Sequence, residues 1–175
     1  FAAGLAYLPE DRLGVVLATK PPTTENAVMR EFRTLRRGPL LNWASAREFC
    51  DRIVERFEVK IGRHDAPLAG LSGGNLQRLL LGRELSGKPD VVVASQPTRG
   101  LDVAGVRAIQ RLIVQQRDEG TGVLMVSEDL DELLSLADRI LVMNAGRIVG
   151  EFNAREATRT QIGEAMMGTA TEASS

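Results

Sequence analysis

Residues 71–78, Leu-Ser-Gly-Gly-Asn-Leu-Gln-Arg, could form an anion-binding site at the start of a helix. Ser72 is a residue type that caps helix N-termini, and Gly73 and Gly74 allow the backbone to come close to a ligand. An apolar helix is predicted to follow over residues 76–85, and the N–H groups at a helix start can bind phosphate. The same pattern also fits a capped surface helix that has no ligand.

A second polar stretch, Ser-Gln-Pro-Thr-Arg-Gly-Leu-Asp at residues 95–102, follows a predicted buried strand at 91–94. Together and in this order, the two stretches resemble those of the ATP-binding-cassette (ABC) ATPases. In that family an LSGG signature helix is followed by a strand that ends in Asp-Glu-Pro-Thr and by a D-loop that ends in Leu-Asp. The resemblance extends over about residues 4–168.

The resemblance implies a nucleotide site in which ATP and Mg²⁺ lie between the P-loop of one cassette and the signature of its partner. Glu10 stands in the Q-loop, where most members have Gln, and the form Pro-Glu-Asp-Arg at residues 9–12 is similar to the second cassette of sugar-type importers. The residues that the resemblance assigns to nucleotide binding are Ser72, Gly73, Gly74, Asn75, Glu10 and Asp102.

Three positions that the family uses for hydrolysis are changed in this chain. Ser95 and Gln96 replace the Asp-Glu pair, and Glu128 replaces the switch His. A neutral serine is a poor substitute for the aspartate that helps to hold Mg²⁺, and an amide cannot accept a proton from the attacking water. Loss of a positioned general base costs about 10²–10⁴-fold in rate. We therefore expect these three positions to be degenerate, with no catalytic and no metal-binding residue in the chain.

The Gly-x-x-x-x-Gly-Lys-Ser/Thr motif of a P-loop ATPase does not occur in the sequence. The resemblance then implies that this chain is the C-terminal part of a cassette, cut off from its P-loop. It also implies that the chain has no tightly bound nucleotide of its own. Removal of the P-loop strand and its helix would leave apolar strand edges uncovered. We therefore expect the isolated chain to self-associate or to rearrange.

The order of the predicted elements is that of an α/β protein with a parallel sheet. Strands are predicted at 4–8, 91–94, 122–126 and 139–143, the last pairing as a hairpin with 147–152. Helices are predicted at 24–36, 45–57, 76–85, 103–118, 129–137 and 158–167. The resemblance implies a P-loop NTPase-like ABC cassette that lacks its P-loop portion. It divides the chain into residues 1–12 of the α/β core, a helical subdomain at 13–70, the signature helix and remaining core at 71–168, and a flexible tail at 169–175.

Several residues outside these motifs are predicted to have structural roles. Ser45 and Glu48 fit a capping box that starts a helix, and Cys50 lies on its apolar face and should belong to the core. Trp43 is expected to be half buried in the core, with an interface anchor as the alternative, and His64 to be an ordinary loop residue. The basic residues Arg30, Arg33, Arg36 and Arg37 are predicted to form a solvated cluster, and the resemblance gives contact with a partner or with lipid headgroups as the alternative.

Composition excludes several classes of function. The 22 basic and 23 acidic residues nearly cancel, so no overall field favours nucleic acid. The single cysteine excludes an intrachain disulfide, and no apolar run approaches the ~18 residues of a membrane span.

The resemblance implies a cytoplasmic protein on the inner face of the membrane. Its partners would be a second cassette, a transmembrane permease and, indirectly, a solute-binding protein.

Two functions remain open from the sequence. The first is part of an ATP-binding subunit that energises import of a sugar or nucleoside, contributes its signature to the partner's ATP site and hydrolyses poorly itself. The second is a cassette-shaped interaction module that binds no nucleotide. The missing P-loop favours the module, whereas the intact signature favours the importer, since a scaffold needs no phosphate-binding helix start.

Overall fold

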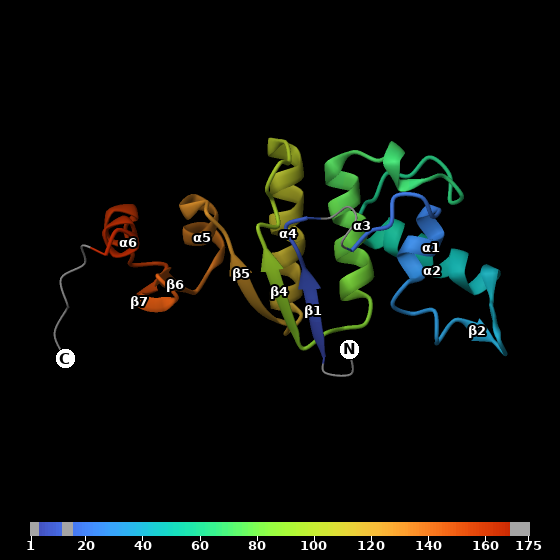
Figure 1. The fold of residues 1–175 in the computed structure, drawn as a ribbon, viewed down its shortest axis with the longest axis horizontal. Helices are drawn as coiled ribbons and strands as arrows, with labels where there is room; N and C mark the ends of the chain where they lie inside the picture. The colour runs from blue at the N-terminus through green and yellow to red at the C-terminus, as the bar shows by residue number, and fades with distance from the viewer. Residues whose placement is uncertain (1–3, 12–15, 169–175) are drawn as a thin grey trace. The chain divides into compact units, whose positions relative to one another are not determined.

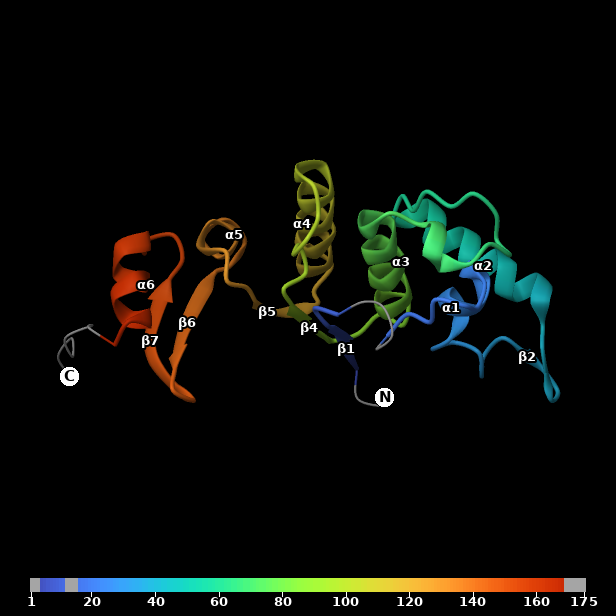
Figure 2. The same cartoon turned by 45° about the horizontal axis from the view of Figure 1, so that its top comes forward.

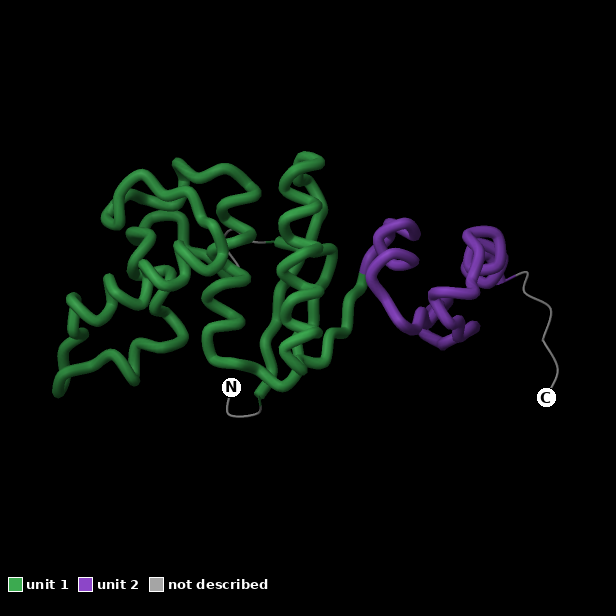
Figure 3. Tube along the Cα trace, turned by 180° about the vertical axis from the view of Figure 1, so that it is seen from behind, with its two compact units in different colours: residues 1–126 green, residues 127–175 purple. Residues whose placement is uncertain are grey.

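A computed structural model describes residues 4–11 and 16–168 of the chain. The chain divides into two compact units, residues 1–126 and residues 127–175 (Figure 3). The first unit is an α/β layer with additional helices, and the second is a hairpin with two helices. The predicted tail at 169–175 and the predicted boundary at residues 12 and 13 lie outside the described residues.

The centre of the first unit is a parallel three-stranded sheet in the order β1-β4-β5. Its strands are β1 (Leu5–Leu8), β4 (Val91–Ser95) and β5 (Gly122–Val126), with Leu5 opposite Val91 and Val93 opposite Leu124. Because strand side chains alternate between faces, Ala6, Leu8, Val92 and Ala94 share one buried face. The other face presents exposed apolar side chains: Leu5, Tyr7, Val91, Leu124 and Val126.

Two helices, α3 (Gly73–Leu85) and α4 (Val103–Asp118), lie on the same side of the sheet (Figure 2). Both run antiparallel to the strands, so their N-termini and the carboxyl ends of the strands lie toward the same end of the unit (Figure 1). Ile109 and Ile113 of α4 are buried in the core. Val103 is exposed in the first turn of the helix.

The remaining helices of the first unit precede α3 in the chain. They are α1 (Thr23–Val28), α2 (Trp43–Arg56) and the 3-10 helix η1 (Leu68–Gly70). On α2, Ala46, Cys50 and Ile53 are buried, which confirms the predicted apolar face. Helices α2 and α3 come so close that a Cβ at Gly82 would lie 2.4 Å from Cγ2 of Ile53, so this position requires glycine.

The structure corrects two predictions between residues 23 and 56. The predicted helix over 24–36 ends at Val28, and the chain continues through turns into the short hairpin β2 (Arg36–Arg37) and β3 (Leu40–Leu41). Helix α2 begins at Trp43 and not at a Ser45 capping box. Asn42 is the N-cap, and its side chain accepts from the N–H groups of Ala44 and Ser45.

The second unit contains α5 (Leu130–Leu136), β6 (Arg139–Asn144), β7 (Arg147–Asn153) and α6 (Arg159–Met166). Strands β6 and β7 pair antiparallel, which confirms the predicted C-terminal hairpin. Ala145 and Gly146 have positive φ values of 47° and 76°, the backbone geometry that favours a two-residue hairpin turn. Arg159 Nε donates to Asp131 Oδ1 at 2.7 Å and so connects α6 to α5.

The predicted fold class is confirmed, with a parallel sheet, covering helices and a terminal antiparallel hairpin. Across residues 4–11 and 16–168, no helix has both the length and the apolar character needed to cross a membrane. The proposed division into subdomains at residues 70 and 71 stays a prediction.

Candidate functional site

The start of α3 is the first part of the candidate site. Ser72 is its N-cap, as predicted, and its Oγ accepts from the backbone N–H of Asn75 at 3.4 Å and from Asn75 Nδ2 at 3.1 Å. The Oδ1 atom of Asn75 accepts in turn from the N–H of Lys60 at 2.8 Å. Asn75 therefore fixes the helix start to the segment that follows α2.

Ser72 and Gly73 are exposed, and a Cβ added to Gly74 would meet no atom within 4 Å. Packing within this chain therefore does not explain the glycine at position 74. A small residue there leaves room for something outside the chain to approach the first N–H groups of the helix. This combination is suited to an anion, because the positive end of the helix dipole lies at the same place.

The carboxyl edge of the sheet is the second part of the site. Because β1 and β4 are parallel neighbours, the segments that follow them leave the sheet at the same edge (Figure 1). Glu10, which follows β1, forms an ion pair with Arg99, which follows β4. The structure therefore brings together a predicted site residue and an arginine for which our sequence analysis predicted no role.

Gln96 is held in a strained conformation directly after β4. Its φ of 47° lies in the left-handed region, which is uncommon for residues other than glycine. Its backbone N–H donates to the carbonyl oxygen of Val126 at 2.8 Å, which fixes the strand end to β5. Strained residues of this kind are concentrated at functional sites. Ser95, the preceding residue, is half buried at the end of β4.

The segment after Gln96 ends at Asp102, which is the N-cap of α4. Its Oδ1 atom accepts from the N–H of Gly105 at 2.6 Å. Asp102 is exposed, so its carboxylate combines a capping role with access to solvent. Glu128 belongs to the second unit, where it is exposed and precedes Asp129, the N-cap of α5. Within the described part of the chain, no group of three or more His, Cys, Asp or Glu residues could hold a metal ion.

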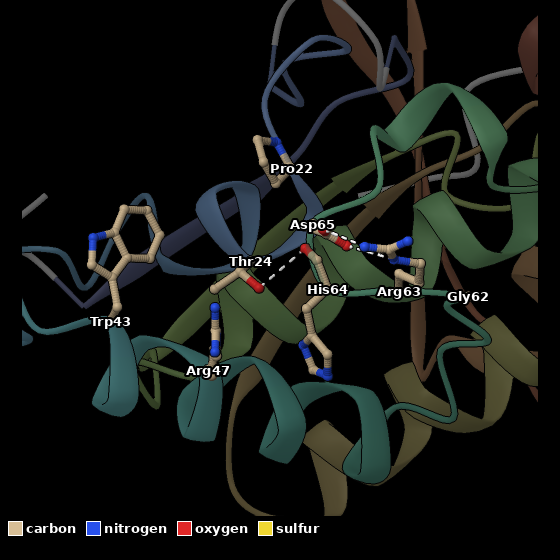
Figure 4. A pocket seen from close by; sticks show the side chains of 8 residues that line it. All are labelled: Pro22, Thr24, Trp43, Arg47, Gly62, Arg63, His64 and Asp65. Carbon is tan, nitrogen blue, oxygen red and sulfur yellow. Dashed lines mark hydrogen bonds and ion pairs between the residues drawn. The ribbon is translucent and has the colours of Figure 1, made fainter.

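A groove of about 450 Å³ lies apart from these residues, between α1, α2 and the loop at 62–65 (Figure 4). Trp43 lines it and is 50% exposed, outside the core in which we predicted it to be half buried. His64 lies in the loop, as predicted; its carbonyl oxygen accepts from Thr24 Oγ1 at 3.2 Å, and its Nε2 lies 3.2 Å from Asp51 Oδ1. None of the predicted nucleotide-binding residues lines the groove.

Arg30 does not belong to a solvated basic cluster, which corrects the prediction. Its guanidinium forms an ion pair with Glu84 of α3 and donates to the carbonyl oxygen of Leu5 at 3.3 Å. Arg33, Arg36 and Arg37 are exposed. Sequence reasoning also missed Gln77, which lies on α3 with its side chain fully buried. No signal in the sequence distinguishes it from an exposed helical glutamine.

Comparisons with known proteins give consistent results. No protein-family model matches the chain. It is 45% identical over 170 residues to the glucose import ATP-binding protein TsgD13 of Haloferax volcanii, covering 94% of this chain and 31% of that protein. It is 36% identical to the ribose import ATP-binding protein RbsA 2 of Rhizobium meliloti, covering 91% of this chain and 31% of that protein. It is 32% identical to the guanosine import ATP-binding protein NupO of Bacillus subtilis, covering 95% of this chain and 33% of that protein.

Solved structures show the same fold. The ATP-binding cassette MJ0796, solved as a dimer in a post-hydrolysis state with ADP and Pi, matches with a TM-score of 0.71 at 22% identity, covering 89% of this chain and 65% of that one. CbiO1 from Clostridium perfringens matches with a TM-score of 0.67 at 23% identity, covering 87% of this chain and 58% of that one. The chain spans about a third of the length of the curated relatives. It is therefore a homologue of a segment of the ATP-binding proteins of sugar and nucleoside importers, with the fold of an ABC ATPase cassette.

Proposed function

We propose that this chain is part of the ATP-binding subunit of an importer for a sugar or a nucleoside, and that it presents residues 72–75 to ATP held by a partner cassette. The observation that carries the proposal is the exposed start of α3, where Ser72 is the cap and Gly74 faces open space. In this assembly ATP and Mg²⁺ would be held mainly by the P-loop of the partner cassette. The chain itself would hold no nucleotide tightly.

The site at the carboxyl edge of the sheet would hydrolyse ATP poorly. Ser95 supplies no carboxylate to help hold Mg²⁺, and Gln96 cannot act as a general base. Gln96 is also fixed by its hydrogen bond to Val126, so its backbone position does not depend on a charged side chain. The three degenerate positions, Ser95, Gln96 and Glu128, and the complete signature would give the subunit one productive ATP site and one impaired site.

The remaining partners follow from the same proposal. A transmembrane permease would be contacted by the helical part of the first unit, and a solute-binding protein would act on that permease from the other side of the membrane. The subunit would then lie on the cytoplasmic face. The import names of the relatives support this reading, whereas a nucleotide-free interaction module remains the second candidate for a chain without a P-loop motif.

Three variants of the assembled importer test the proposal. Ser72→Arg would fill the space above the helix start and should abolish transport. Ser72→Ala removes the same cap, at a cost of about 1 kcal/mol, and the hydroxyl, but leaves that space open, so transport should fall less than in Ser72→Arg. Gly163→Arg adds the same charge at a place in α6 where a Cβ meets nothing within 4 Å, and it should transport normally. Full transport by Ser72→Arg would favour the interaction module.

A further inference from the structure

One pair of side chains joins the two segments that leave the sheet edge. Glu10 follows β1, Arg99 follows β4, and their ion pair connects residues 89 positions apart in sequence. The pairing of the two strands continues to the end of β1, where Leu8 lies opposite Ala94. The starting points of both segments are therefore fixed by the sheet, and the ion pair joins them again beyond it.

Stabilisation of the fold is a poor explanation for this pair. The side chain of Glu10 is 47% exposed and that of Arg99 is 58% exposed. Ion pairs this accessible to solvent contribute little to folding stability and are screened by salt. The effect that the geometry does provide is a defined distance between the two segments.

Arg99 lies on a segment that is fixed at both ends. Its backbone N–H donates to the carbonyl oxygen of Gln96 at 3.2 Å, and Gln96 is itself bonded to Val126. The N–H of Leu101 donates to Thr98 at 3.2 Å, and Asp102 then caps α4. A displacement of Arg99 would therefore be transmitted to Gln96 on one side and to Asp102 on the other.

The charge of Glu10 gives the pair a second effect. A carboxylate near the phosphates of ATP would repel them, and neutralisation by an arginine reduces this repulsion. Arg99 is placed to supply that neutralisation.

We propose that Glu10 and Arg99 are positioning residues that couple the segment after β1 to residues 95–102, so that the position of one segment sets the position of the other. This inference rests on the proposed function and on the resemblance to ABC ATPases, which assigns Glu10 and Asp102 to nucleotide binding. The pair then links the state of that site to the segment that leads into α4.

Charge exchange in the assembled importer tests the coupling. The readout is the amount of solute transported per ATP hydrolysed, because a loss of folded protein lowers both quantities and leaves their ratio unchanged. Glu10→Arg and Arg99→Glu should each lower this ratio about tenfold, and the double exchange should restore most of it. If a charge reversal prevents assembly, the neutral variants Glu10→Gln and Arg99→Gln replace it: each should lower the ratio, and the double neutral variant should lower it no further than either single change.

The controls separate this inference from the proposed function. Each variant should show the thermal unfolding midpoint of the unaltered protein, because the pair is exposed. A double exchange that transports as poorly as the single changes, or an unaffected Arg99→Glu, would overturn the coupling. If Ser72→Arg abolishes transport while the charge variants have no effect, the proposed function stands and only the coupling fails. If Ser72→Arg transports normally, the proposed function fails first.

Discussion

Glu84 and Arg83, neighbours on α3, form a buried ion pair in which Arg83 Nη2 lies 3.0 Å from Glu84 Oε1. Their side chains are only 6% and 4% exposed, and the other carboxylate oxygen of Glu84 binds Arg30. Burial lowers the pKa of Arg83, and the charge of Glu84 and its hydrogen bond oppose that effect. Arg83 also donates to the carbonyl oxygen of Val16 at 2.8 Å. One carboxylate therefore holds two arginines that link α3 to other parts of the unit.

Glu84→Gln should destabilise the protein by about 3 kcal/mol, because Arg83 would stay buried without its counter-charge. Urea unfolding of the two proteins at neutral pH measures the difference. Glu55→Gln is a matched control at an exposed position of α2 and should shift the free energy of unfolding by less than about 0.5 kcal/mol. Equal effects of the two substitutions would show that the buried pair is not needed.

Gln77 is expected to limit stability. Its side chain is fully buried, and within the described part of the chain neither of its amide atoms has a hydrogen-bond partner. Gln77→Met keeps a similar shape and removes the unpaired amide, so it should stabilise the protein by about 1–3 kcal/mol. Gln116→Met is the control and should destabilise the protein, because buried Gln116 donates to Glu119 Oε2 at 3.3 Å and the variant would lose this hydrogen bond. Loss of stability in both variants would contradict this account.

Cys50 should make stability depend on pH under alkaline conditions. Burial raises the pKa of its thiol to about 11, and a hydrogen bond with Thr24 offsets only part of this rise. An exposed thiol has a pKa of about 8.5. Between that pH and pH 11, the unfolded chain therefore loses a proton that the folded chain keeps. Stability should be unaffected by this group below about pH 8.5 and should fall by up to about 1.4 kcal/mol per pH unit above it.

Urea unfolding of Cys50→Ala at pH 8 and pH 10.5 provides the comparison. The variant should be less stable at both values, because a buried side chain is shortened, but the difference from the unaltered protein should become smaller at the higher pH. In the folded, unaltered protein the thiol should react slowly with a thiol-specific reagent, as expected for a buried core residue. A constant difference between pH 8 and pH 10.5 would be inconsistent with the raised pKa.

The uncovered face of the sheet should cause the isolated chain to self-associate. Exposed apolar side chains on this face come from all three strands, and they include Leu5, Tyr7 and Leu124. Contiguous apolar surface of this kind is a typical association site. Sedimentation velocity should show larger species as the concentration rises, and Leu124→Lys should shift the distribution toward the monomer. Val103→Lys, at an exposed position of α4, should leave it unchanged. A strict monomer at high concentration would count against this expectation.

Local patterns in the sequence were sufficient to predict most of the elements. The apolar run at Val91–Ser95 and the strand at Gly122–Val126 are where expected, and Ser72 caps α3 as its residue type suggests. The turn at Ala145 and Gly146 also follows from local composition. These features depend on interactions between residues close in sequence, which is why the sequence reveals them.

Contacts between distant residues account for what the sequence did not show. Arg30 binds Glu84, which is 54 positions away, and this contact removes Arg30 from the basic cluster that its neighbours suggested. The cap of α2 is Asn42 and not Ser45. The N–H of Asn42 donates to the carbonyl oxygen of Leu35 at 2.9 Å, at the base of the β2–β3 hairpin, and its side chain caps α2. Neither contact can be derived from helix propensity or capping preference alone.

In the candidate site too, some features could be predicted from the local sequence and others depend on contacts between distant residues. The spacing of residues 72–75 was enough to predict a helix start suited to an anion, and that start is exposed in the structure. The role of Arg99 depends on the pairing of β1 with β4, because only that pairing brings Glu10 within reach. Strand order is a property of the whole fold, so the partner of Glu10 could not be predicted from the sequence.

The most direct test of the central claim compares ATP hydrolysis in two variants of the assembled importer. The claim is that the signature serves the partner's ATP while the chain's own site contributes little. Ser72→Arg should therefore reduce the ATPase rate to near background, whereas Gln96→Ala should leave it almost unchanged, because residue 96 already lacks a general base. Similar losses in the two variants would contradict the asymmetry and would place productive hydrolysis at both sites.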